Sequence, residues 1–132
     1  MRRFLSITEP MDADTQHQIT KAIAAHGQWK TRLKAAIEHG ASDFDVSTTR
    51  VDDRCEFGKW LQSGVAPEQR SSPHYESCRK LHAEFHQHAA EILSLALQGR
   101  AADAEAKMEH GSPFAHVSAQ LVREMSDWQK AA

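Results

Sequence analysis

The chain has 132 residues, with 16 Lys or Arg and 18 Asp or Glu, so its formal net charge is −2. This length is typical of one domain that buries about two-thirds of its unfolded surface, so folding need not depend on a bound metal. The two signs of charge are interspersed along the chain. We therefore expect no basic surface for nucleic acid or for an anionic membrane.

The sequence also lacks the signals of a membrane or secreted protein. No apolar segment approaches the roughly 20 residues needed to cross a bilayer, and residues 1–10 lack the apolar region and cleavage site of a signal peptide. Two cysteines are too few for a disulfide framework, and in a reducing compartment they favour metal binding or redox chemistry. We expect a cytoplasmic protein with no membrane partner.

The first predicted helix carries a histidine on its apolar face. Residues 1–13 are expected to form a flexible lead, followed by a helical domain over residues 14–130 whose first helix runs from about Asp14 to Glu38. The predicted stripe comprises Ile19, Ala22, Ile23, Lys30, Leu33 and Ile37. His26 lies on this stripe, with Trp29 at its edge. A buried unpaired polar group costs about 1–3 kcal/mol, so His26 needs a polar partner.

A cysteine follows in a short predicted helix. Residues 39–50 are rich in turn formers and are expected to form a loop. Asp52 is a good N-cap, which would place Cys55 in the first turn of a helix that ends at Ser63 and Gly64. Because amides and the helix dipole favour a thiolate there, we expect Cys55 to be chemically active.

A third helix, predicted after a loop at residues 64–71, carries two histidines on one face. Ser72 is its expected N-cap, Pro73 suits its first turn, and it ends near Gly99. The apolar stripe comprises Cys78, Phe85, Ala89, Leu93 and Ala96. His82 and His86 fall on this stripe four residues apart, so their imidazoles lie one above the other and can bind one metal ion. His88 points elsewhere.

The last predicted helix runs from about Ala101 to Trp128 and is interrupted at Gly111-Ser112-Pro113, because proline removes a backbone donor. No strand-like alternation is long enough to predict a sheet. The predicted fold class is all-α, with antiparallel long helices and one short helix that carries the cysteine.

Three motifs together resemble a known family. HGQWK at residues 26–30, CEFGKWL at 55–61 and HAEFH at 82–86 are similar, in order and spacing, to the motifs of the bacterial chemoreceptor zinc-binding domain. The resemblance covers roughly Asp14 to Trp128 and implies a four-helix bundle with a three-histidine, one-cysteine Zn²⁺ site. The ligands that it implies are His26, Cys55, His82 and His86, which are also the residues that stripe position and helix chemistry select.

The resemblance implies a regulatory module in bacterial signalling. Such a module would respond to zinc availability, to oxidation of the zinc-bound Cys55, or to both, in chemotaxis or cyclic-di-GMP control. Family members usually carry this domain beside a chemoreceptor or a diguanylate cyclase, and this chain has no room for either. It is expected to be a stand-alone domain that acts on such a partner, a piece of a longer protein, or a zinc buffer. The family also implies a homodimer.

Two other functions are weighed against the sensor. A zinc-buffering or structural zinc protein would need the same four ligands. A zinc hydrolase normally keeps one metal position for water, whereas four protein ligands leave none. Glu84 lies on another face, and HAEFH is not the HExxH order of metalloproteases. We therefore expect no enzymatic activity.

The remaining residues of interest are apolar or ambiguous. Four aromatic residues are expected to pack around the site and shield it from water: Trp29, Phe57, Trp60 and Phe85. Cys78 lies one turn before His82. It is either a small buried apolar residue or a second thiol that could reach Cys55 or replace a ligand.

Overall fold

A computed structural model describes residues 12–132, which form helices and no strand. The helices are α1 (Ala13–His39), α2 (Val46–Arg50), α3 (Glu56–Ser63), α4 (Pro67–Arg70), α5 (Pro73–Leu97), α6 (Ala101–Met108) and α7 (Pro113–Ala131). The all-α fold class is therefore confirmed. The flexible lead expected for residues 1–13 lies, apart from its last two positions, outside the described residues.

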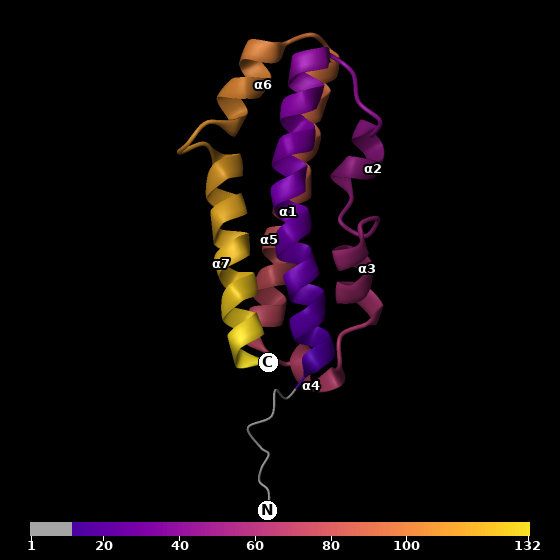
Figure 1. Ribbon diagram of the computed structural model, residues 1–132, viewed down its shortest axis with the longest axis vertical. Helices are drawn as coiled ribbons and strands as arrows, with labels where there is room; N and C mark the ends of the chain where they lie inside the picture. The colour runs from indigo at the N-terminus through magenta and orange to yellow at the C-terminus, as the bar shows by residue number, and fades with distance from the viewer. Residues whose placement is uncertain (1–11) are drawn as a thin grey trace, which may run out of the picture.

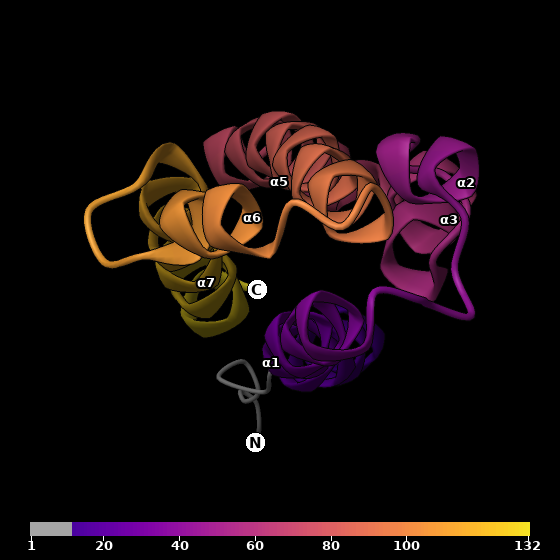
Figure 2. The same ribbon diagram turned by 90° about the horizontal axis from the view of Figure 1, so that it is seen from above.

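The helices pack as a bundle of rods. In Figure 1 the chain rises through α1, descends through α2 and α3, rises through α5, and descends through α6 and α7. Figure 2 shows α1, α5 and α7 seen nearly end-on, with α2 and α3 stacked as a further segmented rod. Helix α5 contacts α1, α2, α6 and α7, whereas α3 packs on α1. Helices α1 and α5 run in the same direction because the α2–α3 rod reverses the chain between them.

The long helices begin and end close to the predicted residues. Ser72 and Ser112 cap α5 and α7 by accepting hydrogen bonds from the amides of His74 and Ala115, at 3.1 and 3.2 Å. A proline follows each cap at the first helical position, where its missing N–H costs nothing. The break predicted at residues 111–113 therefore separates α6 from α7.

Two short helices lie where only loops were expected. Helix α2 falls within residues 39–50, and its N-cap Asp45 accepts a hydrogen bond from the Thr48 amide at 2.7 Å. Helix α4 falls within residues 64–71 and starts at Pro67. Each has at most five residues. One turn of helix is too short to show the 3.6-residue apolar period, so periodicity missed both.

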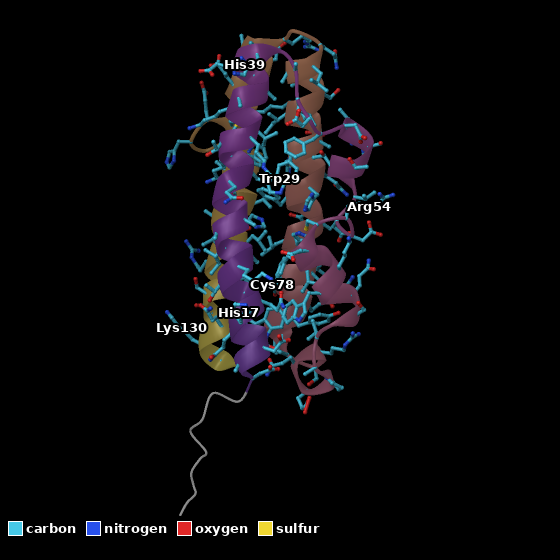
Figure 3. All side chains as sticks on the ribbon, turned by 45° about the vertical axis from the view of Figure 1, so that its right-hand side comes forward. His17, Trp29, His39, Arg54, Cys78 and Lys130 are labelled. Atoms are coloured by element: carbon cyan, nitrogen blue, oxygen red, sulfur yellow. The ribbon has the colours of Figure 1, made fainter. Side chains whose placement is uncertain are left out.

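The core lies where the rods face one another. Its largest fully buried apolar side chains are Trp128, Phe85, Phe114, Ile19, Leu33, Leu61, Ile92, Leu93, Leu121 and Met125. Figure 3 shows Trp29 and Cys78 among the side chains between the rods, with His39 and Lys130 at the periphery. Every predicted stripe residue of α5 is buried. On α1, Lys30 is exposed, contrary to prediction, and the small side chains of Thr15 and Ala36 occupy buried positions instead.

Because apolar side chains from all the long helices form this core, we expect the protein to stay folded when metal is removed. Chelation should leave most of the far-ultraviolet circular dichroism of the helices and lower the melting temperature. Leu121→Ala truncates a fully buried side chain and should lower the free energy of unfolding by about 2–5 kcal/mol. Its melting temperature is the reference for damage to the core itself. A random-coil spectrum after chelation would contradict this expectation.

Candidate metal centre

Two buried histidines of α5 form the centre of the site. The side chains of His82 and His86 are 0% and 2% exposed, and their Nε2 atoms lie 3.1 Å apart. One helical turn separates the two residues, which places both imidazoles on the face that points into the bundle. Two ring nitrogens that face each other at this distance can share a proton or bind one cation.

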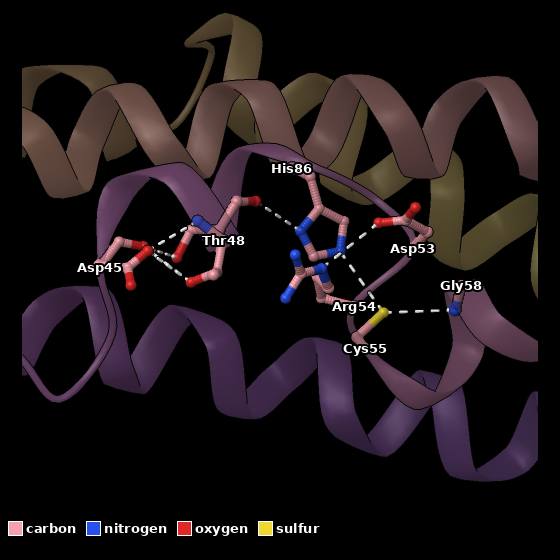
Figure 4. Close-up of polar contacts among 8 residues, drawn as sticks. Asp45, Thr48, Asp53, Arg54, Cys55, Gly58 and His86 are labelled. Carbon is pink, nitrogen blue, oxygen red and sulfur yellow. Dashed lines mark hydrogen bonds and ion pairs between the residues drawn. The ribbon is translucent and has the colours of Figure 1, made fainter.

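Cys55 brings a sulfur to the same point. Its Sγ lies 3.3 Å from Nε2 of His82 and 3.6 Å from Nε2 of His86. The structure corrects one prediction here: Cys55 is itself the N-cap of α3, so Asp52 does not cap this helix. The Gly58 amide donates to Sγ at 3.4 Å, as an amide does to a capping side chain (Figure 4).

These three distances fit a zinc ion. Zinc binds nitrogen at about 2.0–2.1 Å and thiolate sulfur at about 2.3 Å, usually in a tetrahedron. In such a tetrahedron two nitrogens are about 3.3 Å apart, and a nitrogen and a sulfur about 3.6 Å apart. The ligand atoms of Cys55, His82 and His86 all lie within 4.8 Å of one another and form a group that could hold a metal ion.

A hydrogen bond from outside the group orients His86. Its Nδ1 lies 2.9 Å from the carbonyl oxygen of Thr49 in α2. Because a carbonyl only accepts, Nδ1 of His86 carries the proton and Nε2 is left with a free lone pair. Metal-binding histidines are commonly oriented in this way. Figure 4 shows this contact beside the Asp45–Thr48 cap that stabilises α2.

His26 lies nearby but outside this group. Its side chain is 5% exposed, and its ring centroid is 6.1 Å from that of His82. Its Nδ1 lies 3.3 Å from the carbonyl oxygen of Ala22, so Nε2 is the nitrogen with a free lone pair. His26 and Cys55 both line a small pocket of about 60 Å³, large enough for a small ion or water.

Two ring nitrogens of these histidines lack any partner. Nε2 of His26 and Nδ1 of His82 are buried and make no hydrogen bond with the described residues. A buried polar atom without a partner costs about 1–3 kcal/mol. For His26 a metal ion would supply the missing partner, which is a second indication that the residues suit a metal.

Burial keeps the three histidines neutral. It lowers the pKa of His26 to about 4, although the hydrogen bond to Ala22 opposes the shift. Burial also lowers the pKa of His82 and the pKa of His86. At His86 the hydrogen bond to Thr49 opposes this shift. The imidazoles are therefore in the form that binds metal at neutral pH.

Cys55 differs from its predicted state. Burial raises the pKa of its thiol, and the amides of Gly58 and Phe57 offset that effect only in part. The amides at the start of α3 favour the thiolate, as predicted, but the loss of water on burial outweighs them. Metal binding would have to displace the thiol proton.

Aromatic side chains surround the imidazoles. Phe85 is fully buried with its ring 4.2 Å from that of His26, Phe57 stands edge-on to His82 at 5.1 Å, and Trp29 stands edge-on to His86 at 5.7 Å. Trp60 lies one layer further out, where it stacks on Phe57 at 5.9 Å. Apolar walls of this kind exclude water and strengthen polar interactions inside.

Cys78 is buried and free, and Cys55 is free and partly exposed. Burial raises the pKa of the Cys78 thiol to about 12, so it is a poor nucleophile and a poor ligand at neutral pH. This environment favours the interpretation of Cys78 as a packing residue.

Comparison with known proteins agrees with the site. Residues 26–93, just over half of the chain, match the family model of the chemoreceptor zinc-binding domain, so the chain belongs to that family. The matched range begins at His26 and contains all three predicted motifs. No curated protein and no solved structure shows significant similarity to the chain.

Among residues 12–132, no helix combines the length and apolar character needed to cross a membrane.

One residue that sequence reasoning did not single out fixes the position of Cys55. A Cβ at Gly58 would lie 1.7 Å from the carbonyl oxygen of Asp52 and 2.8 Å from its carbonyl carbon. The loop from Asp52 to Cys55 therefore packs on α3 at a point where only glycine fits. The glycine within the CEFGKWL motif was a signal of such a close backbone approach.

We expect Gly58→Ala to displace this loop and lower metal affinity by at least about tenfold, as changes in residues that orient ligands do. Titration with zinc, together with the sulfur-to-metal absorption band of the cobalt form, would measure the effect. Gly27→Ala is the matched control, because a Cβ at Gly27 meets nothing within 4 Å. Equal affinities for the two variants would contradict this account of Gly58.

Proposed function

We propose that this chain is a regulatory zinc-binding module that binds one Zn²⁺ ion. The proposed ligands are His26, Cys55, His82 and His86. The observation that carries the proposal is the convergence of Cys55 Sγ with two imidazole Nε2 atoms at 3.1–3.6 Å in a buried site. His26 is proposed as the fourth ligand because its Nε2 is buried, unpartnered and adjacent to the cavity that Cys55 also lines.

The four proposed ligands come from three separate parts of the fold. His26 belongs to α1, Cys55 stands at the start of α3, and the histidine pair belongs to α5. Helix α3 packs on α1, and α2 packs on α5. We propose that the α2–α3 rod takes the place of one helix in the four-helix bundle of the family. Metal binding would then tie this segmented rod to two continuous helices.

We propose that the α2–α3 rod carries the output of the module. When bound, zinc would hold Cys55 as a thiolate and neutralise its charge. Loss of the metal would remove one restraint on Cys55, and the Thr49–His86 hydrogen bond would remain as a restraint on α2. A signalling partner that contacts residues 44–64 would sense this change. The proposed partners are a chemoreceptor or a diguanylate cyclase, and a second copy of the chain in a homodimer.

We further propose that oxidation is a second input, acting in the cytoplasm. Among the four proposed ligands only Cys55 can be oxidised reversibly under mild conditions. A peroxide would transfer one oxygen to the Cys55 sulfur, giving the sulfenic acid while the peroxide is reduced to hydroxide. Sulfenic acid is a weaker ligand than thiolate. A reducing compartment is required for such a switch to return to its starting state.

The proposal gives the module no enzymatic role. Four protein ligands leave no position for a catalytic water. Glu84, between the two histidines in sequence, is exposed to solvent and so faces away from the buried pair. A zinc buffer or a structural zinc protein is the alternative, and it would bind the metal without any change at the α2–α3 rod.

The first test of the proposal is metal stoichiometry. Elemental analysis of protein purified without added zinc should give one equivalent per chain that survives dialysis. His26→Ala and His86→Ala should each lower the affinity at least about tenfold, which corresponds to about 1.4 kcal/mol. The matched control is His88→Ala, two residues from His86 on the same helix and beside Glu91 near the surface. If His88→Ala weakens binding as much as His86→Ala, the assigned helix face is wrong.

The second test is oxidative release. Limited peroxide should modify Cys55 and free zinc at the same rate, measured with a zinc-binding dye and by mass mapping of both cysteines. Cys78→Ala should behave like the wild type, because Cys78 is fully buried. Zinc that stays bound to protein modified at Cys55, or consumption of Cys78 first, would leave a zinc sensor without a redox input.

A further inference from the structure

A second pocket opens on the outer face of the metal centre. Its volume is about 420 Å³, within the roughly 300–1,000 Å³ of small-molecule sites. Cys55 and His86 form part of its lining, together with Trp29 of α1 and Phe44, which precedes α2. A molecule in this pocket would therefore lie against two of the proposed zinc ligands.

A guanidinium group is held at this pocket by aromatic rings. The Cζ atom of Arg32 lies 4.8 Å from the ring centroid of Phe44 and 5.6 Å from that of Trp29. These cation–π contacts cover the face of the guanidinium and leave its N–H edges for hydrogen bonding. Within the described part of the chain, no carboxylate lies within 4.0 Å of Arg32. Its guanidinium therefore has no salt-bridge partner among the described residues.

Two acidic groups beside the pocket already have cationic neighbours. Glu56, which is part of the lining, lies 3.8 Å from the Lys21 amine. Asp53 lies 4.0 Å from the guanidinium of Arg54, which also lines the pocket (Figure 4). Asp52 is a further acidic group, and its negative charge acts on Cys55 and His86. The positive charge available to a ligand is therefore that of Arg32, beside the rings of Trp29 and Phe44.

We propose that this pocket is a binding site for a small carboxylate or related oxyanion. The Arg32 guanidinium would hold the anion by two parallel N–H···O bonds, the geometry that this group favours. The aromatic rings of Trp29 and Phe44 would pack against the apolar part of the ligand. The rest of the ligand would then reach Cys55 and His86.

The site gives anionic molecules preferred access to Cys55. One consequence rests on the proposed function: chelators that carry a carboxylate remove the bound zinc faster than neutral chelators of similar affinity. The anion site itself requires only the side chains of the metal-free protein. Its failure and the failure of zinc binding can therefore be observed separately.

The test compares two alkylating agents on metal-free protein. Iodoacetate and iodoacetamide react at the same carbon with the Cys55 thiolate, forming a C–S bond and releasing iodide, but only iodoacetate carries a carboxylate. Because both require the same thiolate, the ratio of their rates removes any change in the thiol's acidity. Arg32→Gln should lower this ratio at Cys55 by about threefold, the size of one exposed charge contact. Lys34→Gln, which removes the same charge two residues away and outside the pocket, should leave it unchanged.

An unchanged ratio in Arg32→Gln, or an equal fall in Lys34→Gln, would overturn the proposal. Alkylation of the buried Cys78 would reveal a variant that has unfolded. In that case a measurement on the wild type decides. Benzoate should slow the reaction of iodoacetate with Cys55 and benzamide should not, whereas equal effects of the two would refute the anion site.

Discussion

The constraint on which the rest of the structure depends is the burial of three neutral imidazoles in a helical core. His26, His82 and His86 are each at most 5% exposed, and two of their ring nitrogens have no hydrogen-bond partner among the described residues. An apolar core accepts such groups only when something satisfies them. The Thr49 carbonyl is the partner of His86 Nδ1. A metal ion bound where Cys55 meets the histidine pair would be a second partner.

This constraint explains the unusual form of the second rod. A continuous helix could not offer both a backbone carbonyl to His86 and a capping sulfur to the histidine pair, because its carbonyls would be used internally. The chain instead forms two short helices separated by a loop. The free carbonyl of Thr49 comes from the first, and the N-cap of the second is Cys55. Gly58 permits the loop to pack closely enough to fix the sulfur.

The same geometry links the two proposals. The segmented rod contributes Cys55 to the metal centre, and together with α1 it lines the pocket that holds Arg32. A ligand in that pocket and a metal ion in the site would contact the same two residues, Cys55 and His86. Under both proposals, access to the metal and the position of the α2–α3 rod would be coupled through shared side chains, with no need for a long-range conformational pathway.

The sequence by itself determined the long helices, the Ser72 and Ser112 caps and most of the residues that point inward, because apolar periodicity and proline and serine positions are local signals. It also selected His26, His82 and His86, since a polar residue on an apolar stripe is visible without a structure, and Cys55, from its expected place at the start of a short helix. Only the tertiary structure decided that Cys55 is a cap, that its thiol pKa is raised, and that Thr49 orients His86. These features depend on backbone groups and on water excluded by residues distant in sequence, and periodicity carries no information about either.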